Sequence, residues 1–109
     1  MPETRPTASV EEIREIARCI VGRFHPQKIV LFGSCAAGAA TEDSDVDLLV
    51  VMETAEAPLH TAARIAGAID DRFPLDIAVS RPSTLKESLE RKGSIATTVM
   101  TEGAVLYEA

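Results

Sequence analysis

The order of hydrophobic and polar positions predicts a chain in which helices and strands alternate. Between Ser9 and Phe24 the apolar side chains are three and four positions apart, a spacing typical of a helix with one buried face. Short apolar runs without this spacing predict strands at Lys28–Phe32, Val46–Met52, Leu75–Val79 and Ala104–Tyr107. Further helices are expected at Cys35–Ala40, from Pro58 to Phe73, at Pro82–Arg91 and at Ser94–Thr101.

The same spacing predicts which helical side chains are buried and which fold class results. In the helix that begins at Pro58, it places Leu59 on the inner side together with Ile69. In the first helix, Cys19 is expected to be a buried side chain that fills space in the core. Strands separated by helices predict an α/β or α+β fold, with one small mixed sheet and helices packed against it.

The length fits one small domain. A chain of 109 residues ordinarily forms a single domain and buries roughly 60–70% of its unfolded surface. We therefore expect one domain over residues 1–109, with residues 1–8, which include Pro2 and Pro6, as a flexible lead-in.

The charge balance argues against nucleic acid as the main substrate. The formal net charge is −6, and Arg91-Lys92 is the only adjacent cationic pair in the sequence. Proteins that bind DNA or RNA ordinarily carry a basic face, because neutralising phosphates supplies much of their affinity. No apolar run reaches the roughly 18 residues of a membrane span, and no signal pattern opens the chain. We expect a cytoplasmic protein without direct DNA or RNA binding and without membrane attachment.

The strongest chemical signal is Gly33-Ser34, followed after a ten-residue gap by Asp45-Val46-Asp47. Alternate residues of a strand point to the same face, so Asp45 and Asp47 can present both carboxylates to one point. Magnesium is commonly held by one or two carboxylates together with water and substrate phosphates. The glycine turn leads into a predicted helix start, where free backbone N–H groups suit a phosphate. A phosphate cradle beside paired acids indicates nucleotidyl transfer.

Two rival motifs fail at particular positions. The segment that starts at Asp43 imitates a calcium loop, but Leu48 replaces the required glycine and Thr54 stands where the last glutamate belongs. The segment Gly33–Gly38 reads G-S-C-A-A-G, which is neither a dinucleotide fingerprint nor a P-loop, because no Gly-Lys pair follows.

This pattern resembles the minimal nucleotidyltransferase domains of the polymerase-β superfamily. The resemblance rests on G-S, the gap, D-x-D and the flanking V-L-F and L-L-V, and it extends to Pro74–Val79 and to the final Glu102–Glu108. It implies that Asp76 is the third carboxylate, joining Asp45 and Asp47 as ligands of two Mg²⁺ ions. It also implies ATP or another nucleoside triphosphate as substrate, with Gly33 and Ser34 on its phosphates.

One departure from the family pattern concerns charge. The family usually reads G-S-x-A-R-G, often with a second arginine at x, whereas this chain has Cys35 and Ala37. Two cations that would face the phosphates are therefore missing, which puts full activity in doubt.

Stand-alone domains of this kind are similar to the antitoxins of paired toxin–antitoxin modules. The resemblance implies a helical HEPN-domain ribonuclease as partner and transfer of AMP from ATP to one of its hydroxyl groups. Larger family members add a helical domain that shapes the acceptor site, and we expect the partner to supply it here. Two alternatives stay open. One is an inactive antitoxin that neutralises its partner by binding, and the other is transfer to a small molecule.

Overall fold

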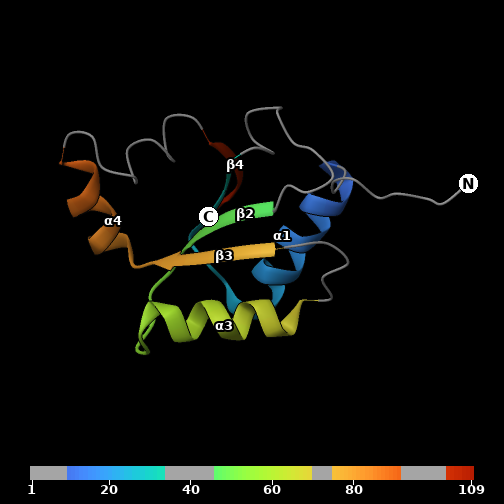
Figure 1. Cartoon of the computed structure of the whole chain (residues 1–109), viewed down its shortest axis with the longest axis horizontal. Helices are drawn as coiled ribbons and strands as arrows, with labels where there is room; N and C mark the ends of the chain where they lie inside the picture. Colours follow the sequence, from blue (N-terminus) through green and yellow to red (C-terminus); the bar gives the residue numbers. More distant parts are fainter. Residues whose placement is uncertain (1–9, 34–45, 70–74, 92–102) are drawn as a thin grey trace, which may run out of the picture.

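The computed structural model describes residues 10–33, 46–69, 75–91 and 103–109. Seven elements follow one another along these residues (Figure 1). They are α1 (Val10–Phe24), β1 (Lys28–Phe32), β2 (Val46–Val51), α3 (Pro58–Ala68), β3 (Leu75–Ser80), α4 (Pro82–Leu89) and β4 (Ala104–Glu108). The predicted α+β class, with one mixed sheet and helices against it, is confirmed.

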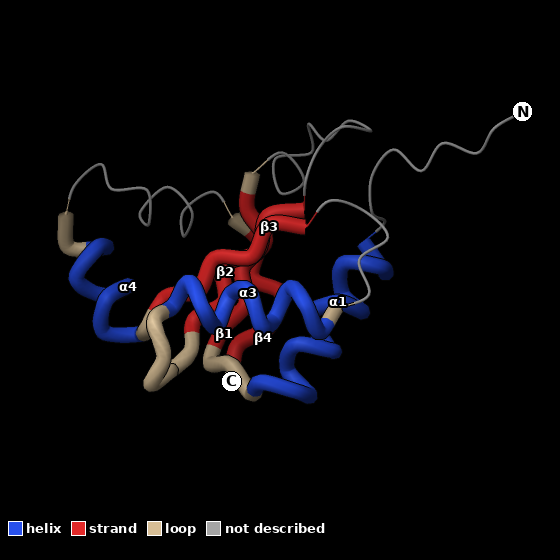
Figure 2. The backbone as a smooth tube through the Cα atoms, turned by 60° about the horizontal axis from the view of Figure 1, so that its bottom comes forward, coloured by secondary structure: helices blue, strands red, loops and turns tan. Residues whose placement is uncertain are grey.

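The strands form one four-stranded sheet in the order β3-β2-β1-β4. β1 runs antiparallel to both β2 and β4, whereas β2 and β3 are parallel. A parallel pair needs a crossover connection, and α3 provides it, lying in front of the sheet in Figure 2. Central β2 is thereby flanked on one side by β1 and on the other by β3, which brings residues from three separate segments into neighbouring positions.

The face of the sheet that meets α1 and α3 holds the main core. Alternate strand residues point to this face and are buried, as expected from a period of two. The core combines Ile13, Ile16, Ala17 and Ile20 of α1, Ile29 and Leu31 of β1, Val46, Leu48 and Val50 of β2, and Ile65 with Ile69 at α3. Both helices therefore cover the same side of the sheet.

The opposite face of the sheet is covered at one end by α4. Leu85 of α4 packs with Val30, Leu49 and Val51, and Phe32 lies against this second cluster. These strand residues alternate with those of the main core, so Asp47, the neighbour of Val46 and Leu48, also belongs to this second face.

The end of α1 follows from its local sequence. His25 adopts φ 53 and donates its backbone N–H to the Val21 carbonyl at 3.1 Å, which is a left-handed helix cap. His25 also precedes Pro26, and a residue before proline disfavours the helical conformation. α1 therefore ends at Phe24, shortly before β1 begins at Lys28.

Arg81 fixes the connection that leads from β2 into α3. Its Nε donates to the Thr54 carbonyl at 3.1 Å and its guanidinium to the Glu56 carbonyl at 2.9 Å. Thr54 Oγ1 and buried Thr61 Oγ1 share a further hydrogen bond of 2.8 Å. These bonds hold the start of α3 against the end of β3, and so position the crossover.

Leu59 and Cys19 were predicted to be buried, and both predictions are wrong. Leu59 is 80% exposed, because the inner side of α3 is formed by Thr61, Ala62 and Ile65, and Leu59 lies off that stripe. Cys19 is exposed as a free thiol, because Ala17 and Ile20 set the buried side of α1 and Cys19 lies off it.

Several expectations fall outside the described residues. They are the lead-in at 1–8 and the helices at Cys35–Ala40 and Ser94–Thr101. The helix expected from Pro58 to Phe73 is shorter than predicted, because α3 ends at Ala68 and Ile69 is extended, with φ −96 and ψ 136. Among the helices that the structure describes, none has the length and apolar character needed to cross a membrane.

Candidate active site

The turn after β1 brings the chain against an acidic side chain. Gly33 adopts φ 77, a left-handed conformation that glycine accepts without a steric cost. A Cβ atom at Gly33 would overlap the Asp47 Oδ2 atom and would lie 3.3 Å from its Cγ. Only glycine leaves the space in which the Asp47 carboxylate lies beside the backbone.

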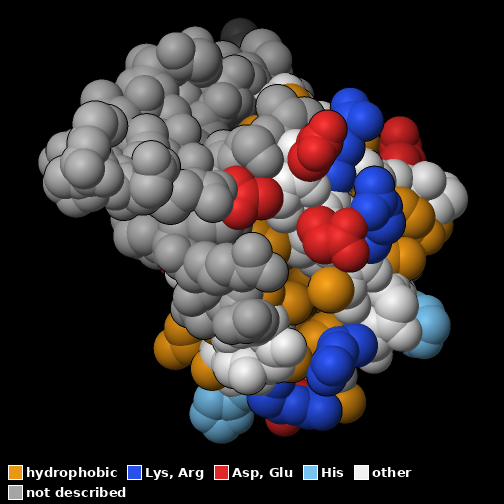
Figure 3. All heavy atoms as spheres, turned by 90° about the vertical axis from the view of Figure 1, so that its right-hand side faces the viewer, with side chains coloured by type: hydrophobic (Ala, Val, Ile, Leu, Met, Phe, Trp, Pro, Cys, Tyr) orange, Lys and Arg blue, Asp and Glu red, His pale blue; other side chains and the backbone are white. Residues whose placement is uncertain are grey.

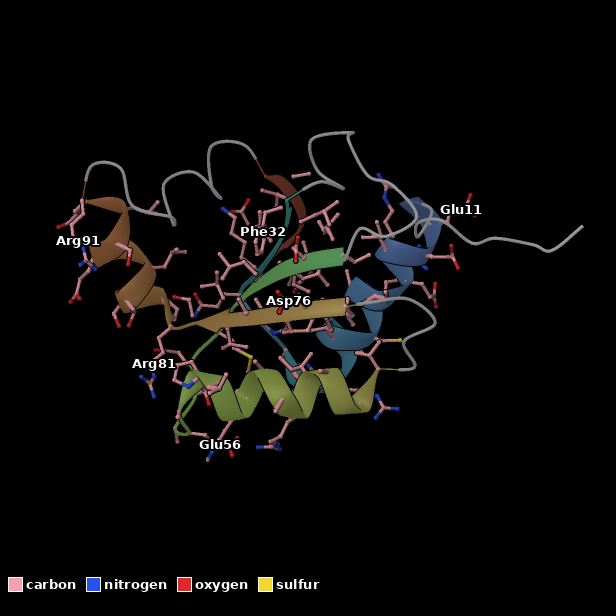
Figure 4. All side chains as sticks on the ribbon, viewed as in Figure 1. Glu11, Phe32, Glu56, Asp76, Arg81 and Arg91 are labelled. Atoms are coloured by element: carbon pink, nitrogen blue, oxygen red, sulfur yellow. The ribbon has the colours of Figure 1, made fainter. Side chains whose placement is uncertain are left out.

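Asp47 and Asp76 lie side by side on parallel strands. They are register partners in the β2–β3 pair, and neighbouring strands are about 4.8 Å apart. Register partners share a face of the sheet, so both carboxylates point away from α1 and α3. Asp47 is half-buried and Asp76 is exposed, and Figure 4 labels Asp76 on β3. The fold thus joins two aspartates that are far apart in the sequence.

Two neighbouring carboxylates repel one another unless a cation or a proton lies between them. Oxygen ligands of this kind are those that Mg²⁺ prefers, and the ion ordinarily takes one or two of them with water and substrate phosphates. The part of the chain that the structure describes holds no cluster of three metal-ligating side chains, and the two carboxylates of Asp47 and Asp76 are the candidate metal ligands there. The donor set of Asp47 and Asp76 fits a magnesium ion.

The remaining predicted site residues lie outside the described part of the chain. They are Ser34 and Asp45, together with the two positions where the family arginines are missing, Cys35 and Ala37. Of the five predicted site residues, the structure therefore places Gly33, Asp47 and Asp76, and these three lie together.

Phe32 is a further residue beside the acid pair that the sequence motifs did not indicate. It is the β1 register partner of Asp47, which in turn pairs with Asp76. Phe32 is half-buried and packs against the Val30 cluster on the face that carries the acids. Its position next to Asp47 in the sheet, on the side away from Asp76, places an apolar side chain beside the acid pair. Its position immediately before Gly33, at the end of an apolar run, is a signal that could have found it.

Most of the chain matches the model of a known protein family. The family model "Polymerase beta, Nucleotidyltransferase" matches residues 14–109. No curated protein sequence matches the chain significantly.

Solved structures share the fold. A candidate nucleotidyltransferase from Sulfolobus solfataricus aligns with a TM-score of 0.60 and 19% identity, over 88% of this chain and 77% of that one. A toxin–antitoxin complex with AMP-PNP aligns with a TM-score of 0.56 and 23% identity, over 88% and 73%. A mutant of the toxin–antitoxin pair MntA-HpeT aligns with a TM-score of 0.52 and 20% identity, over 94% and 75%.

These structural likenesses concern the fold, since all three identities are below 25%. The family model matches the chain from within α1 to the last residue, a range that includes Gly33, Asp47 and Asp76. This chain belongs to the polymerase beta nucleotidyltransferase family.

Proposed function

We propose that this protein transfers AMP from ATP to a hydroxyl group of a partner protein in a magnesium-dependent reaction. We further propose that it acts in this way as the antitoxin of a HEPN-domain ribonuclease. The observation that carries the proposal is the contact of the Asp47 carboxylate with the Gly33 backbone beside Asp76. That arrangement combines a glycine turn suited to a phosphate chain with a carboxylate pair suited to Mg²⁺.

Each residue has a defined task in this reaction. Asp45, Asp47 and Asp76 would hold two Mg²⁺ ions, and Ser34 would hydrogen-bond the β or γ phosphate. Bound magnesium neutralises phosphate charge and lowers the pKa of a hydroxyl group. The acceptor oxygen attacks the α phosphorus of ATP, the bond to the β phosphate breaks, and pyrophosphate leaves. Asp76, which is exposed, would accept the proton of the acceptor hydroxyl.

The proposed partner is supported by two of the structural likenesses. Both are toxin–antitoxin complexes, and one of them was solved with AMP-PNP, an ATP analogue. A helical ribonuclease with a HEPN domain is the partner that the family resemblance implies, and its most plausible acceptor group is a tyrosine hydroxyl.

A second function is favoured by the substitutions Cys35 and Ala37. Without the two family arginines, less positive charge faces the triphosphate, which weakens transition-state stabilisation. In this reading the chain neutralises its partner by forming a complex, without transferring a nucleotide.

A single experiment separates the two functions. The partner ribonuclease is incubated with this protein, ATP and Mg²⁺, and its mass is measured. We expect a mass increase of one AMP with the wild type and with the control Glu53→Gln, which changes an exposed acid beyond the end of β2. We expect none with Asp47→Asn. If the Asp47→Asn variant still protects cells from the ribonuclease and leaves no adduct, the protein acts as a binding antitoxin.

A further inference from the structure

A groove between α1 and β4 is separate from the acid pair. Its cavity volume is about 500 Å³. α1 contributes Arg14, Arg18 and Val21, and β4 contributes Val105, Leu106 and Tyr107. The floor is therefore apolar, and the α1 wall carries two cations one helical turn apart.

The β4 side of the groove is an edge of the sheet that the structure describes. β4 is the last strand in the order β3-β2-β1-β4, so among the described residues no strand pairs with its outer side. Val105 on this strand is 50% exposed. Edge strands in stable monomers are ordinarily shielded by charge, proline or a covering element, because an open apolar edge invites association.

The charge of the groove is opposite to that of the protein. The whole chain has a formal net charge of −6, yet the residues that line the groove include two arginines and no acid. Arg18 pairs with Glu15 at 2.5 Å, but these side chains are 71% and 65% exposed, and such surface pairs contribute little. Both guanidinium groups can therefore receive carboxylates from another molecule.

The groove opens on the α1 side of the sheet, but one of its lining residues, Val105, belongs to the side that carries the acids. Val105 pairs with Val30 of β1, which is two residues before Phe32, the register partner of Asp47. Cross-strand partners share a face, so Val105 and Asp47 belong to the same side of the sheet. Strand spacing and rise place their backbones about 12 Å apart. Figure 3 shows the side of the molecule on which α1 lies, where hydrophobic side chains reach the surface between basic and acidic ones.

We propose that the α1–β4 groove is the docking surface for the partner protein, and that it takes a partner segment with an apolar side chain flanked by aspartate or glutamate. The proposal rests on the proposed function. The apolar side chain would lie on Val105, Leu106 and Tyr107, and the carboxylates would meet Arg14 and Arg18. A partner segment that continues from the groove around the β4 edge, past Val105, would bring a hydroxyl side chain to the acid pair on the other face of the sheet.

The test compares two charge-reversed proteins in binding to the HEPN-domain ribonuclease. One carries Arg14→Glu and Arg18→Glu in the groove. The control carries Arg23→Glu and Arg64→Glu, which make the same charge change on exposed arginines outside the groove. We expect the groove variant to weaken the Kd about tenfold or more, and the control to stay within about twofold, because fully exposed charges away from an interface contribute little.

Adduct formation provides a second readout. The groove variant is expected to raise the KM for the partner protein while kcat stays near the wild-type value, since the acid pair is untouched. Thermal unfolding followed by circular dichroism shows whether both variants remain folded. Added salt should weaken wild-type binding and change binding by the groove variant much less.

The outcomes separate the two proposals. Equal binding by the groove variant and the control, with adduct formation intact, overturns the docking surface and leaves the proposed function standing. A wild-type protein that neither binds nor modifies the ribonuclease overturns the proposed function and the docking surface with it. If sedimentation instead shows a dimer of this chain that Arg14→Glu and Arg18→Glu dissociate, the groove serves a second copy, and the docking proposal is wrong.

Discussion

Replacing Gly33 by alanine tests the link between the glycine turn and the acid pair. The new methyl group would overlap the Asp47 Oδ2 atom, which is the far end of a side chain that can rotate. The overlap is relieved when the Asp47 carboxylate turns away from its position beside the turn. The backbone cost is separate, since φ at this position is 77 and a left-handed conformation costs a residue with a Cβ about 1–2 kcal/mol.

These two effects should appear in different assays. The free energy of unfolding, measured by chemical denaturation, should fall by about 1–2 kcal/mol. For a domain of this size, each kcal/mol lost lowers the Tm by about 4–8 °C. Transfer of AMP should fall far more, by about 100-fold, because displacing a catalytic group by about 1 Å has effects of that size.

A matched control is Gly67→Ala in α3. A Cβ at Gly67 would meet nothing within 4 Å, so alanine there should stabilise the helix by about 0.5–1 kcal/mol and leave transfer unchanged. Wild-type transfer by the Gly33→Ala protein would show that the position of the Asp47 carboxylate does not matter, and would refute the reasoning.

Three further predictions concern Asp76, Arg81 and the buried face of α3. Asp76→Asn should leave the Kd for ATP within about threefold and lower turnover about 100-fold or more, measured by titration calorimetry and by adduct formation; unchanged turnover would remove Asp76 from the mechanism. Arg81→Ala should lower the free energy of unfolding by about 1–3 kcal/mol, because the Thr54 and Glu56 carbonyls lose a charged donor. A loss near zero in a denaturation experiment would contradict the role of Arg81. Ile65→Ala should cost about 2–5 kcal/mol, whereas Leu59→Ala should change stability by less than about 0.5 kcal/mol, and equal costs would contradict the assigned face of α3.

The strands were predicted well because each is a short apolar run with clear limits. β1 runs from Lys28 to Phe32 as expected, and β2 ends one residue earlier than expected, at Val51. The pairing of these strands was not predictable in the same way. That Asp47 faces Asp76 depends on the register of β2 against β3, which is set by the packing of the crossover helix and not by either strand alone.

The errors in the helices concern which side chains are buried. Helical spacing fixes which residues share a face but not where that face begins and ends. In α3 the buried stripe is centred on Ala62 and Ile65, so Leu59 lies beside it and is exposed. In α1, Cys19 was predicted to be buried because of its residue type, but it lies beside the stripe set by Ala17 and Ile20 and is exposed. The role of Arg81 was invisible for a different reason, because its carbonyl partners are on a loop more than twenty residues earlier.

The central claim is that the glycine turn and the aspartates form one magnesium–nucleotide site. Isothermal titration of ATP into the protein, with and without Mg²⁺, tests it most directly. We predict binding that requires the divalent ion and is lost when Asp45→Asn and Asp47→Asn are combined. Equal ATP binding by the wild type and this double mutant would contradict the claim.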